Sequence, residues 1–149
     1  MRRMIGWAAL VVAVSSAGCG NSGSTTAASS TSTTTTTSVA TPTTTDVFTG
    51  TLEVGSTVFF TFDVSVNGTV NATVSSISGA GVPSTVQVRL GLGSVTDGNC
   101  VATVFSSAAV ATSTVPVTTT FAPGTYCVSV ADVGNLFRRA DFSLSVAHP

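Results

Sequence analysis

The sequence predicts an all-β protein whose folded part, residues 46–149, is an antiparallel β-sandwich of two sheets. Apolar and polar residues alternate with a period of two over several stretches, and Gly- and Pro-containing turn signals separate these stretches. No stretch carries the 3.6-residue period of an amphipathic helix, and Thr and Val dominate where helix-forming residues would be needed. The pattern predicts about eight or nine short strands, which is typical of a sandwich.

The chain opens with a predicted secretory signal over residues 1–18. Arg2 and Arg3 precede an apolar run, residues 4–14, and the small residues 15–18 follow it. This run is too short to cross a hydrocarbon core about 30 Å thick, because a spanning helix needs roughly 20 apolar residues. A charged start, a short apolar stretch and small residues before a cleavage point together predict an exported protein.

The residues at the predicted cleavage point, Ser16-Ala17-Gly18-Cys19, resemble the cleavage box of bacterial lipoprotein signals, Leu-Ala/Ser-Gly/Ala-Cys. Ser16 stands where that box usually has Leu, and the other three positions match. By this resemblance Cys19 becomes the first residue of the mature protein and carries the lipid. Several acyl chains hold a protein to a membrane far more firmly than one. The alternative is cleavage after Ala17, which leaves Cys19 as a free thiol.

Residues 19–45 are interpreted as a lipid-anchored, low-complexity Thr/Ser tether. Residues 21–45 contain twelve Thr and six Ser and no charged residue. Such a segment cannot bury enough apolar surface to offset its loss of chain entropy, so we expect it to be disordered. It would act as a spacer, and Ser/Thr-rich stalks are often glycosylated. The alternative is that only its length and solubility matter.

The composition changes at Asp46, and strand patterns begin. In residues 57–66 the apolar side chains take the even positions, and only Phe59 departs from this pattern. Asn67-Gly68 follows at once and predicts a tight hairpin, because both central positions of such a turn need a positive φ. The return strand, residues 70–74, again alternates and places its Val and Ala side chains on one face.

The remaining predicted strands follow the same alternation or are shorter. We expect them at residues 48–54, 86–92, 100–105, 108–115, 117–121, 126–131 and 141–146. Turn signals separate them at Gly55-Ser56, Gly79-Ala80-Gly81, Asp97-Gly98, Pro123-Gly124 and Gly134-Asn135. Each sheet is expected to have an apolar inner face and a Thr/Ser outer face, whereas the order of the strands stays open.

Three cysteines leave an odd one in an exported chain. Export implies an oxidising compartment, where Cys100 and Cys127 are expected to form a disulfide. In the chain-entropy model this bond would add about 3–4 kcal/mol to the free energy of unfolding. A lipid on Cys19 would then explain the third cysteine. The alternative for the other two is a pair of reactive thiols.

Residues 121–130, Phe-Ala-Pro-Gly-Thr-Tyr-Cys-Val-Ser-Val, resemble the penultimate-strand motif of bacterial pre-peptidase C-terminal domains, in which a Pro-Gly-Thr-Tyr turn leads into Val-x-Val. The other segments that fit this family are residues 48–52, 59–64 and 142–146. The resemblance covers residues 46–149 and implies a jelly-roll-like β-sandwich that secreted enzymes carry as an accessory, targeting or binding module. Residues 85–90, Thr-Val-Gln-Val-Arg-Leu, stand where family members often have Asp-x-Asp-Leu.

Oxygen-bearing side chains in two predicted loops are the candidates for a metal site. Asp97 and Asn99 flank a glycine, and Asp132 lies in another loop. Calcium takes six to eight oxygen ligands, and neither loop has the regular Asp spacing of a dedicated calcium site. Asp and Asn also stabilise tight turns by themselves. We therefore favour plain turns and expect no metal and no cofactor.

Three other features of the folded part were weighed as sites. Arg138-Arg139, its only charge cluster, would either dock an anionic surface or keep an edge strand soluble, with Asp132 or Asp141 neutralising it. His148 lies one residue from the end, where chains fray, so we expect no catalytic role for it. Phe59 would stack on a sugar or a partner if it is exposed, but we favour a place under a loop or at a sheet edge.

Charge and composition exclude several classes of function. The chain has 5 Lys+Arg, all of them arginine, 6 Asp+Glu and 1 His, with a net charge of -1. Nucleic-acid binding needs a basic surface that this composition does not supply. Ser and Thr nucleophiles lack a base, because the chain has no Lys, a single His and a single Glu, so we expect no enzyme. One His and three Cys are also too few for a structural zinc site.

Together these features predict a non-catalytic cell-envelope lipoprotein, anchored to a membrane by the lipid on Cys19 and facing the periplasm or the exterior. Its β-sandwich would act, as a monomer, as a binding, accessory or structural module for an extracellular protein or glycan. Two alternatives stay open. One is a carbohydrate- or calcium-dependent ligand-binding module, and the other is an accessory subunit of a separately encoded exported enzyme.

Overall fold

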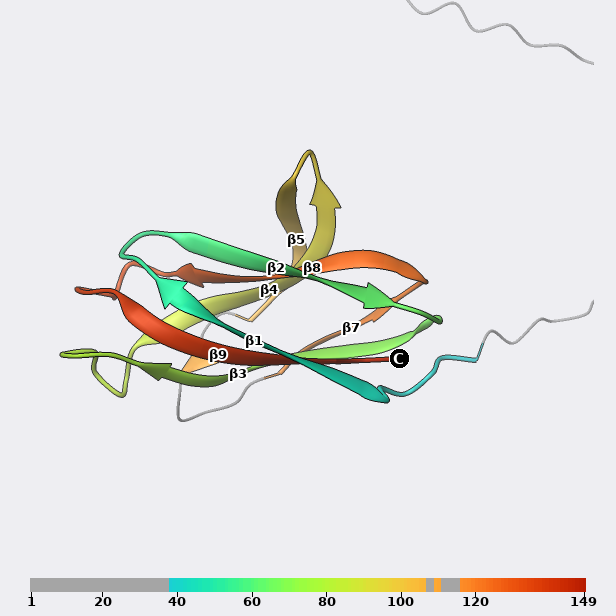
Figure 1. Ribbon diagram of the computed structural model, residues 1–149, viewed down its shortest axis with the longest axis horizontal. Coiled ribbons are helices and arrows are strands. Elements are labelled where there is room, and N and C mark those ends of the chain that lie inside the picture. Colours follow the sequence, from blue (N-terminus) through green and yellow to red (C-terminus); the bar gives the residue numbers. More distant parts are fainter. Residues whose placement is uncertain (1–37, 107–108, 111–115) are drawn as a thin grey trace, which may run out of the picture. The chain divides into compact units, whose positions relative to one another are not determined.

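The computed structural model describes residues 38–106, 109–110 and 116–149. Within these residues the chain forms nine strands that lie in two layers (Figure 1). Their bounds are Thr44–Leu52 (β1), Thr57–Val64 (β2), Gly68–Ser78 (β3), Gln87–Thr96 (β4), Asn99–Phe105 (β5), Ala109–Val110 (β6), Val117–Phe121 (β7), Gly124–Asp132 (β8) and Ala140–His148 (β9). Each strand expected from the sequence has a counterpart among them; of the predicted strand 108–115 the structure describes residues 109–110, which form β6.

The strands form two antiparallel sheets. One has the order β1-β9-β3-β7, and the other has the order β2-β8-β4-β5 with the short β6 paired to β4. The chain changes sheet at most connections, and within the described residues only β4, β5 and β6 follow one another in the same sheet. The antiparallel β-sandwich predicted from the period-two pattern is therefore confirmed. No helix in the described ranges is long and apolar enough to cross a membrane.

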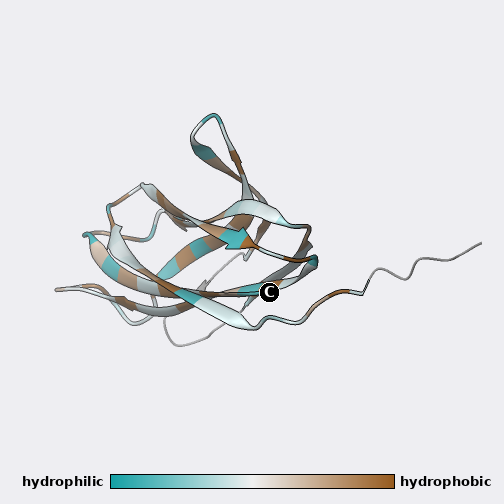
Figure 2. Cartoon of the chain, turned by 45° about the vertical axis from the view of Figure 1, so that its right-hand side comes forward, coloured by the Kyte–Doolittle hydropathy of each residue, from teal (hydrophilic) through white to brown (hydrophobic). Residues whose placement is uncertain are grey.

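The inner faces of the two sheets share one apolar core. Brown segments alternate with near-white or teal ones along the strands in Figure 2, as the period-two pattern requires. The leucines that are completely buried are Leu52, Leu90, Leu92 and Leu144. Phe60 of β2 joins the sheets, because its ring centroid lies 4.9 Å from that of Phe48 and 6.1 Å from that of Phe142. Val66 was expected to face inward but is 50% exposed, since β2 ends at Val64.

Backbone hydrogen bonds hold the chain to the sandwich from Ala40 onward. The Ala40 N–H donates to the Asn67 carbonyl oxygen at 3.0 Å, and the Ala40 carbonyl oxygen accepts from the Thr69 N–H at 2.9 Å. The Thr43 N–H donates to the His148 carbonyl oxygen at 3.1 Å, directly before β1 begins. These bonds satisfy main-chain groups that would otherwise lose water without a partner.

The folded part therefore begins before Asp46, where the composition changes. The sequence boundary came from side-chain hydrophobicity, whereas residues 40–45 are ordered by main-chain bonds that composition does not reveal. The predicted signal peptide, Cys19 and residues 19–37 of the predicted tether lie outside the described residues.

The turn predicted at Asn67-Gly68 is not a hairpin. β2 pairs with β8, and β3 pairs with β7 and β9, so the strands that flank this dipeptide lie in different sheets. Neither residue has a positive φ. Gly68 is needed for a close approach instead, because a Cβ there would lie 2.6 Å from the Ala40 carbonyl oxygen and 2.6 Å from Pro149 Cγ. The dipeptide does contain a glycine with a structural role, but the hairpin predicted from it is wrong.

Apart from the β4–β5 turn, the fully described connections gather at two opposite ends of the sandwich (Figure 1). We call one the loop end; it holds the β1–β2, β3–β4 and β8–β9 connections, residues 53–56, 79–86 and 133–139. We call the other the attachment end; it holds residues 38–43 together with the β2–β3 and β7–β8 connections. β1 runs from the attachment end to the loop end, so its nine residues separate the two ends by about 30 Å.

Candidate functional site

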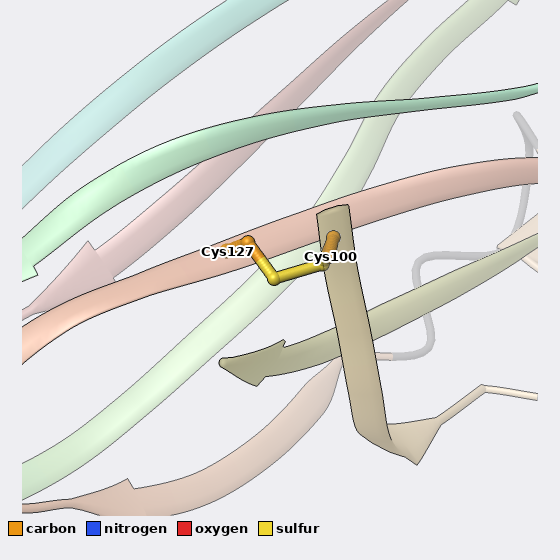
Figure 3. The surroundings of a disulfide bond; sticks show 2 residues. All are labelled: Cys100 and Cys127. Atoms are coloured by element: carbon orange, nitrogen blue, oxygen red, sulfur yellow. A yellow bond between two sulfur atoms is a disulfide. The ribbon is translucent and has the colours of Figure 1, made fainter. Parts of the chain in front are cut away.

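The predicted disulfide between Cys100 and Cys127 is present (Figure 3). It joins β5 to β8, and the two Cα atoms lie 5.8 Å apart. β4 lies between these strands in the sheet, so a flat arrangement would hold the two Cα atoms about 9–10 Å apart, too far for the bond. The β4–β5 hairpin must therefore fold over the outer face of its own sheet, and in Figure 1 it rises from the sandwich.

Gly93 of β4 makes this fold possible. A Cβ at Gly93 would lie 1.9 Å from the Val101 carbonyl oxygen and 2.5 Å from the Ala102 Cα atom, so the backbone of β5 crosses directly over it. The turn predicted at Asp97-Gly98 is confirmed and connects the two strands of the hairpin, and both residues have a positive φ, of 52° and 75°. The disulfide and the glycine together fix the hairpin against β8.

The outer face of the β2-β8-β4-β5 sheet carries two partly exposed aromatic rings. Phe59 is 37% exposed and lies on the edge strand β2, which is one of the places favoured from the sequence. Phe105 on β5 is 52% exposed, and the guanidinium carbon of Arg89 lies 5.2 Å from its ring centroid. The cation of Arg89 is therefore already engaged with an aromatic face.

The oxygen-bearing residues weighed as calcium ligands do not come together. Asp132 pairs with Val88 near the start of β4, whereas Asp97 follows Thr96 at the other end of that ten-residue strand. Asn99 donates a side-chain hydrogen bond to the Asp97 carbonyl oxygen at 3.1 Å, as a turn residue does. Within residues 38–106, 109–110 and 116–149, no group of three or more His, Cys, Asp or Glu side chains is placed to hold a metal ion.

The Asp132 carboxylate holds two loops of the loop end together. Its Oδ2 atom accepts from the Gly55 N–H at 2.8 Å, and its Oδ1 atom accepts from the N–H groups of Gly134, Asn135 and Leu136 at 2.9–3.2 Å. Partial burial by itself raises the pKa of this carboxyl, but the four N–H donors outweigh it and lower the pKa below its ordinary value. The hydrogen bonds of Asp132 thus connect the β1–β2 loop to the β8–β9 loop.

His148 is buried, contrary to the fraying expected near the end of the chain. It pairs with Thr44 between β9 and β1, and β9 is a central strand of its sheet. Its Nε2 atom lies 3.2 Å from the Asp46 carboxylate, and its ring centroid lies 5.7 Å from that of Phe62. The Nδ1 atom is buried without a hydrogen-bond partner. These contacts give His148 a place in the packing between the sheets.

The loop end carries two exposed arginines that have no acidic partner. Arg138 and Arg139 are both exposed, and the Cδ atom of Arg138 lies 3.5 Å from the position a Cβ would take at Gly81. Neutralisation by Asp132 or Asp141 was expected, but the single ion pair of the described residues is that of His148 with Asp46. Asp132 faces backbone donors instead, so both guanidinium groups are available to a ligand.

Two shallow hollows meet at Asp141 of β9. The arginine hollow, of about 390 Å³, is lined by Arg138 and Arg139 of the β8–β9 loop, by Gly79 and Ala80, and by Asp141. The polar hollow, of about 410 Å³, lies on the outer face of β1, β9 and β3. Its polar side chains are Thr49, Thr51, Ser76, Ser78, Asp141 and Ser143. Thr51 Oγ1 donates to Asp141 Oδ1 at 3.0 Å, so this carboxylate is held between the strands.

Phe137 is the feature of this end that the sequence reasoning missed. It directly precedes Arg138 and is 85% exposed, whereas its neighbour Leu136 is buried. The available signal was the sequence Gly134-Asn135-Leu136-Phe137-Arg138-Arg139, a turn followed by an aromatic residue next to two charges. The polar hollow had no sequence signal, because its residues come from three strands far apart in the chain.

No protein-family model matches this chain, and no curated protein matches it either. Its function is therefore inferred from the residues and from their geometry.

Proposed function

We propose that this chain is a non-catalytic binding module of a bacterial cell envelope, exported and held to a membrane by a lipid on Cys19. Residues 19–39 would form the tether, and the β-sandwich would be presented beyond it as a monomer. The disulfide between Cys100 and Cys127 is consistent with an extracytoplasmic location, because such bonds persist in oxidising compartments. The sequence Ser16-Ala17-Gly18-Cys19 supplies the resemblance to a lipoprotein signal.

The opposite placement of the attachment end and the loop end is the observation that carries this proposal. Ala40 is bonded to Asn67 and Thr69 at the attachment end, so a tether that ends there would pull on this end of the sandwich. A tether that ends at the attachment end would leave the loop end, with Phe137 and Arg138, clear of the point of attachment. An unobstructed loop end suits a module that captures a ligand or partner.

The strand order supports the resemblance to pre-peptidase C-terminal domains. A sheet ordered β1-β9-β3-β7 packed on one ordered β2-β8-β4-β5, with the chain changing sheet at most connections, is the arrangement of a jelly roll. In that family such a domain is an accessory or binding module, which is the role we propose here.

The contacts of the titratable side chains support a non-catalytic role. Asp132 accepts four backbone N–H bonds, Asp63 accepts from Thr125 Oγ1, and His148 is buried beside Asp46. A nucleophile needs a general base within hydrogen-bond reach, and these groups are already engaged in packing and turns.

Metabolic labelling with radioactive palmitate in a bacterial host tests the anchorage. We expect the full chain to incorporate the label and to sediment with membranes, and we expect Cys19→Ala to lose both properties. The Cys100→Ala/Cys127→Ala variant is the matched control, since Cys19 is its remaining cysteine, and it should still be labelled. Label that survives Cys19→Ala, or a wild-type chain that takes up none, would contradict the proposal.

A further inference from the structure

The polar hollow presents hydroxyl groups in a regular array. The strand register places Thr49, Ser143 and Ser76 in one row across β1, β9 and β3. The next row holds Thr51, Asp141 and Ser78. Directly opposite residues share a face of the sheet, and adjacent strands lie about 4.8 Å apart. Each Ser or Thr hydroxyl both donates and accepts, so this array matches a ligand that itself carries many hydroxyl groups.

The arginine hollow adds positive charge beside this array. It shares Asp141 with the polar hollow, so one ligand can extend over both. Arg138 and Arg139 form no ion pair within the described residues, and against the single carboxylate of Asp141 they leave an excess of one positive charge. A guanidinium group binds a carboxylate through paired hydrogen bonds, which are stronger than bonds between neutral groups.

Phe137 is an exposed aromatic residue in the loop that carries the two arginines, outside the lining of both hollows. Its side chain is 85% exposed and directly precedes Arg138, so an apolar ring face is available at the same loop. Sugar rings have apolar faces as well as hydroxyl edges, and an aromatic side chain offers them a flat surface for contact. Hydroxyl, guanidinium and aromatic groups are thus present at one end of the sandwich.

We propose that the polar hollow and the arginine hollow together bind an acidic oligosaccharide, in which sugar hydroxyls meet the Ser/Thr array and a sugar carboxylate meets Arg138 and Arg139. This inference rests on the proposed function and names the class of ligand for it. A nucleic acid would need a larger basic surface, since its affinity comes from many phosphate contacts.

Calorimetric titration of the full chain in mild detergent tests the ligand class, with EDTA present so that calcium cannot bridge the partners. The probes are hexameric oligogalacturonate, maltohexaose as a neutral sugar of equal length, and polyphosphate as an anion without sugar rings. We expect saturable binding of oligogalacturonate that weakens with added salt, and clearly weaker binding of the other two probes.

Substitutions test the assigned groups. Arg138→Ala and Arg139→Ala should each weaken oligogalacturonate binding about ten-fold, the effect of losing one charge-assisted contact. Arg89→Ala is the matched control, because Arg89 is an exposed arginine on the other sheet that contacts Phe105, and it should leave the affinity unchanged. Ser76→Ala/Ser78→Ala should also weaken binding, whereas Asp141→Asn should preserve or strengthen it by removing a like charge.

Three results would overturn the inference: no binding of oligogalacturonate, equal affinity for maltohexaose or polyphosphate, or an affinity that Arg138→Ala and Arg139→Ala leave unchanged. The thermal midpoints of all variants show whether each one is folded, and these exposed positions should leave them near that of the wild type. If palmitate labelling fails while oligogalacturonate binds, the anchorage is wrong and this inference stands. If labelling succeeds and no acidic sugar binds, this inference alone fails.

Discussion

Single polar residues decide how the loops of this sandwich are held. Asp132 shows this most clearly, because one half-buried carboxylate at the end of β8 accepts four backbone N–H bonds from two connections. Its sequence context suggested either a turn or a calcium ligand, and its position opposite Val88 separates it from Asp97 and Asn99. A residue type fixes which bonds a side chain can form, but the partners come from chain segments that only the fold brings near.

Asp132→Asn should lower the free energy of unfolding at neutral pH by about 1 kcal/mol. The substitution removes the negative charge and one of the two carboxylate oxygens that accept hydrogen bonds from the loop N–H groups, at a partly exposed position. The folded-state pKa of Asp132 lies below the ordinary 3.8, so its stabilisation is complete above about pH 4. It is lost as the pH falls through the lower folded value. Urea unfolding at pH 7 and pH 2.5 checks this.

The difference between wild type and Asp132→Asn should therefore shrink at the acidic pH. Asp97→Asn is the control for the loss of one charge, since Asn also tolerates the positive φ of that turn position. A difference that is the same at both pH values would contradict the assignment of the stabilisation to the ionised carboxylate.

At the scale of elements, strand existence followed from the sequence, whereas strand partnership did not. Alternation and turn signals located each described strand within a few residues, because side-chain periodicity is a local consequence of the pleat. The Asn67-Gly68 signal failed because it predicts which strands pair, and pairing depends on the other strands that compete for the same edge. The turn at Asp97-Gly98 was expected, but the pairing of β4 with β5 and the fold of this hairpin over Gly93 were not, since that glycine is explained only by the approach of Val101.

The disulfide should determine how firmly the β4–β5 hairpin lies on β8. We expect Cys100→Ala/Cys127→Ala to lower the free energy of unfolding by about 3 kcal/mol. Hydrogen exchange should accelerate first at residues 94–102, because the cross-link to β8 has been removed there. Denaturant unfolding and amide exchange followed by mass spectrometry measure the two effects.

Reduction of the wild-type chain should reproduce the behaviour of the double variant, and the double variant itself should not respond to reductant. If reductant destabilised both proteins equally, the effect would have a source other than this bond. If exchange accelerated uniformly over all strands, the hairpin would not be the element that the disulfide holds.

At the scale of the whole molecule, the attachment end and the loop end lie at opposite ends of the β-sandwich. The attachment end is ordered by Ala40, Gly68 and Pro149, whereas the loop end carries Phe137 and the exposed arginines. The proposed role of the loop end in binding depends on this separation of the two ends. The contact at Gly68 is therefore the one to perturb, since a side chain there collides with the Ala40 carbonyl oxygen.

Gly68→Ala should displace residues 38–43 and lower the free energy of unfolding by about 1–3 kcal/mol, as overpacking does. The amides of Ala40 and Thr69 should lose protection from hydrogen exchange, because the new methyl group disrupts the bond from the Ala40 N–H to the Asn67 carbonyl oxygen and the bond from the Thr69 N–H to the Ala40 carbonyl oxygen. Thr43→Ala is the control, since it changes an exposed side chain and keeps the backbone bond to His148. Unchanged protection at Ala40 in Gly68→Ala would contradict the assignment.

The sequence by itself determined the all-β class, the approximate strand positions and the pairing of Cys100 with Cys127. These properties follow from the periodicity of side chains, the composition and the number of cysteines. Each of these can be read from the sequence without knowing which segments come together in space. Only the tertiary structure decided the order of the strands, the burial of His148, the fold of the hairpin over Gly93 and the meeting of the two hollows at Asp141. Each of these depends on contacts between segments far apart in the chain, and a single sequence does not encode such contacts as a local pattern.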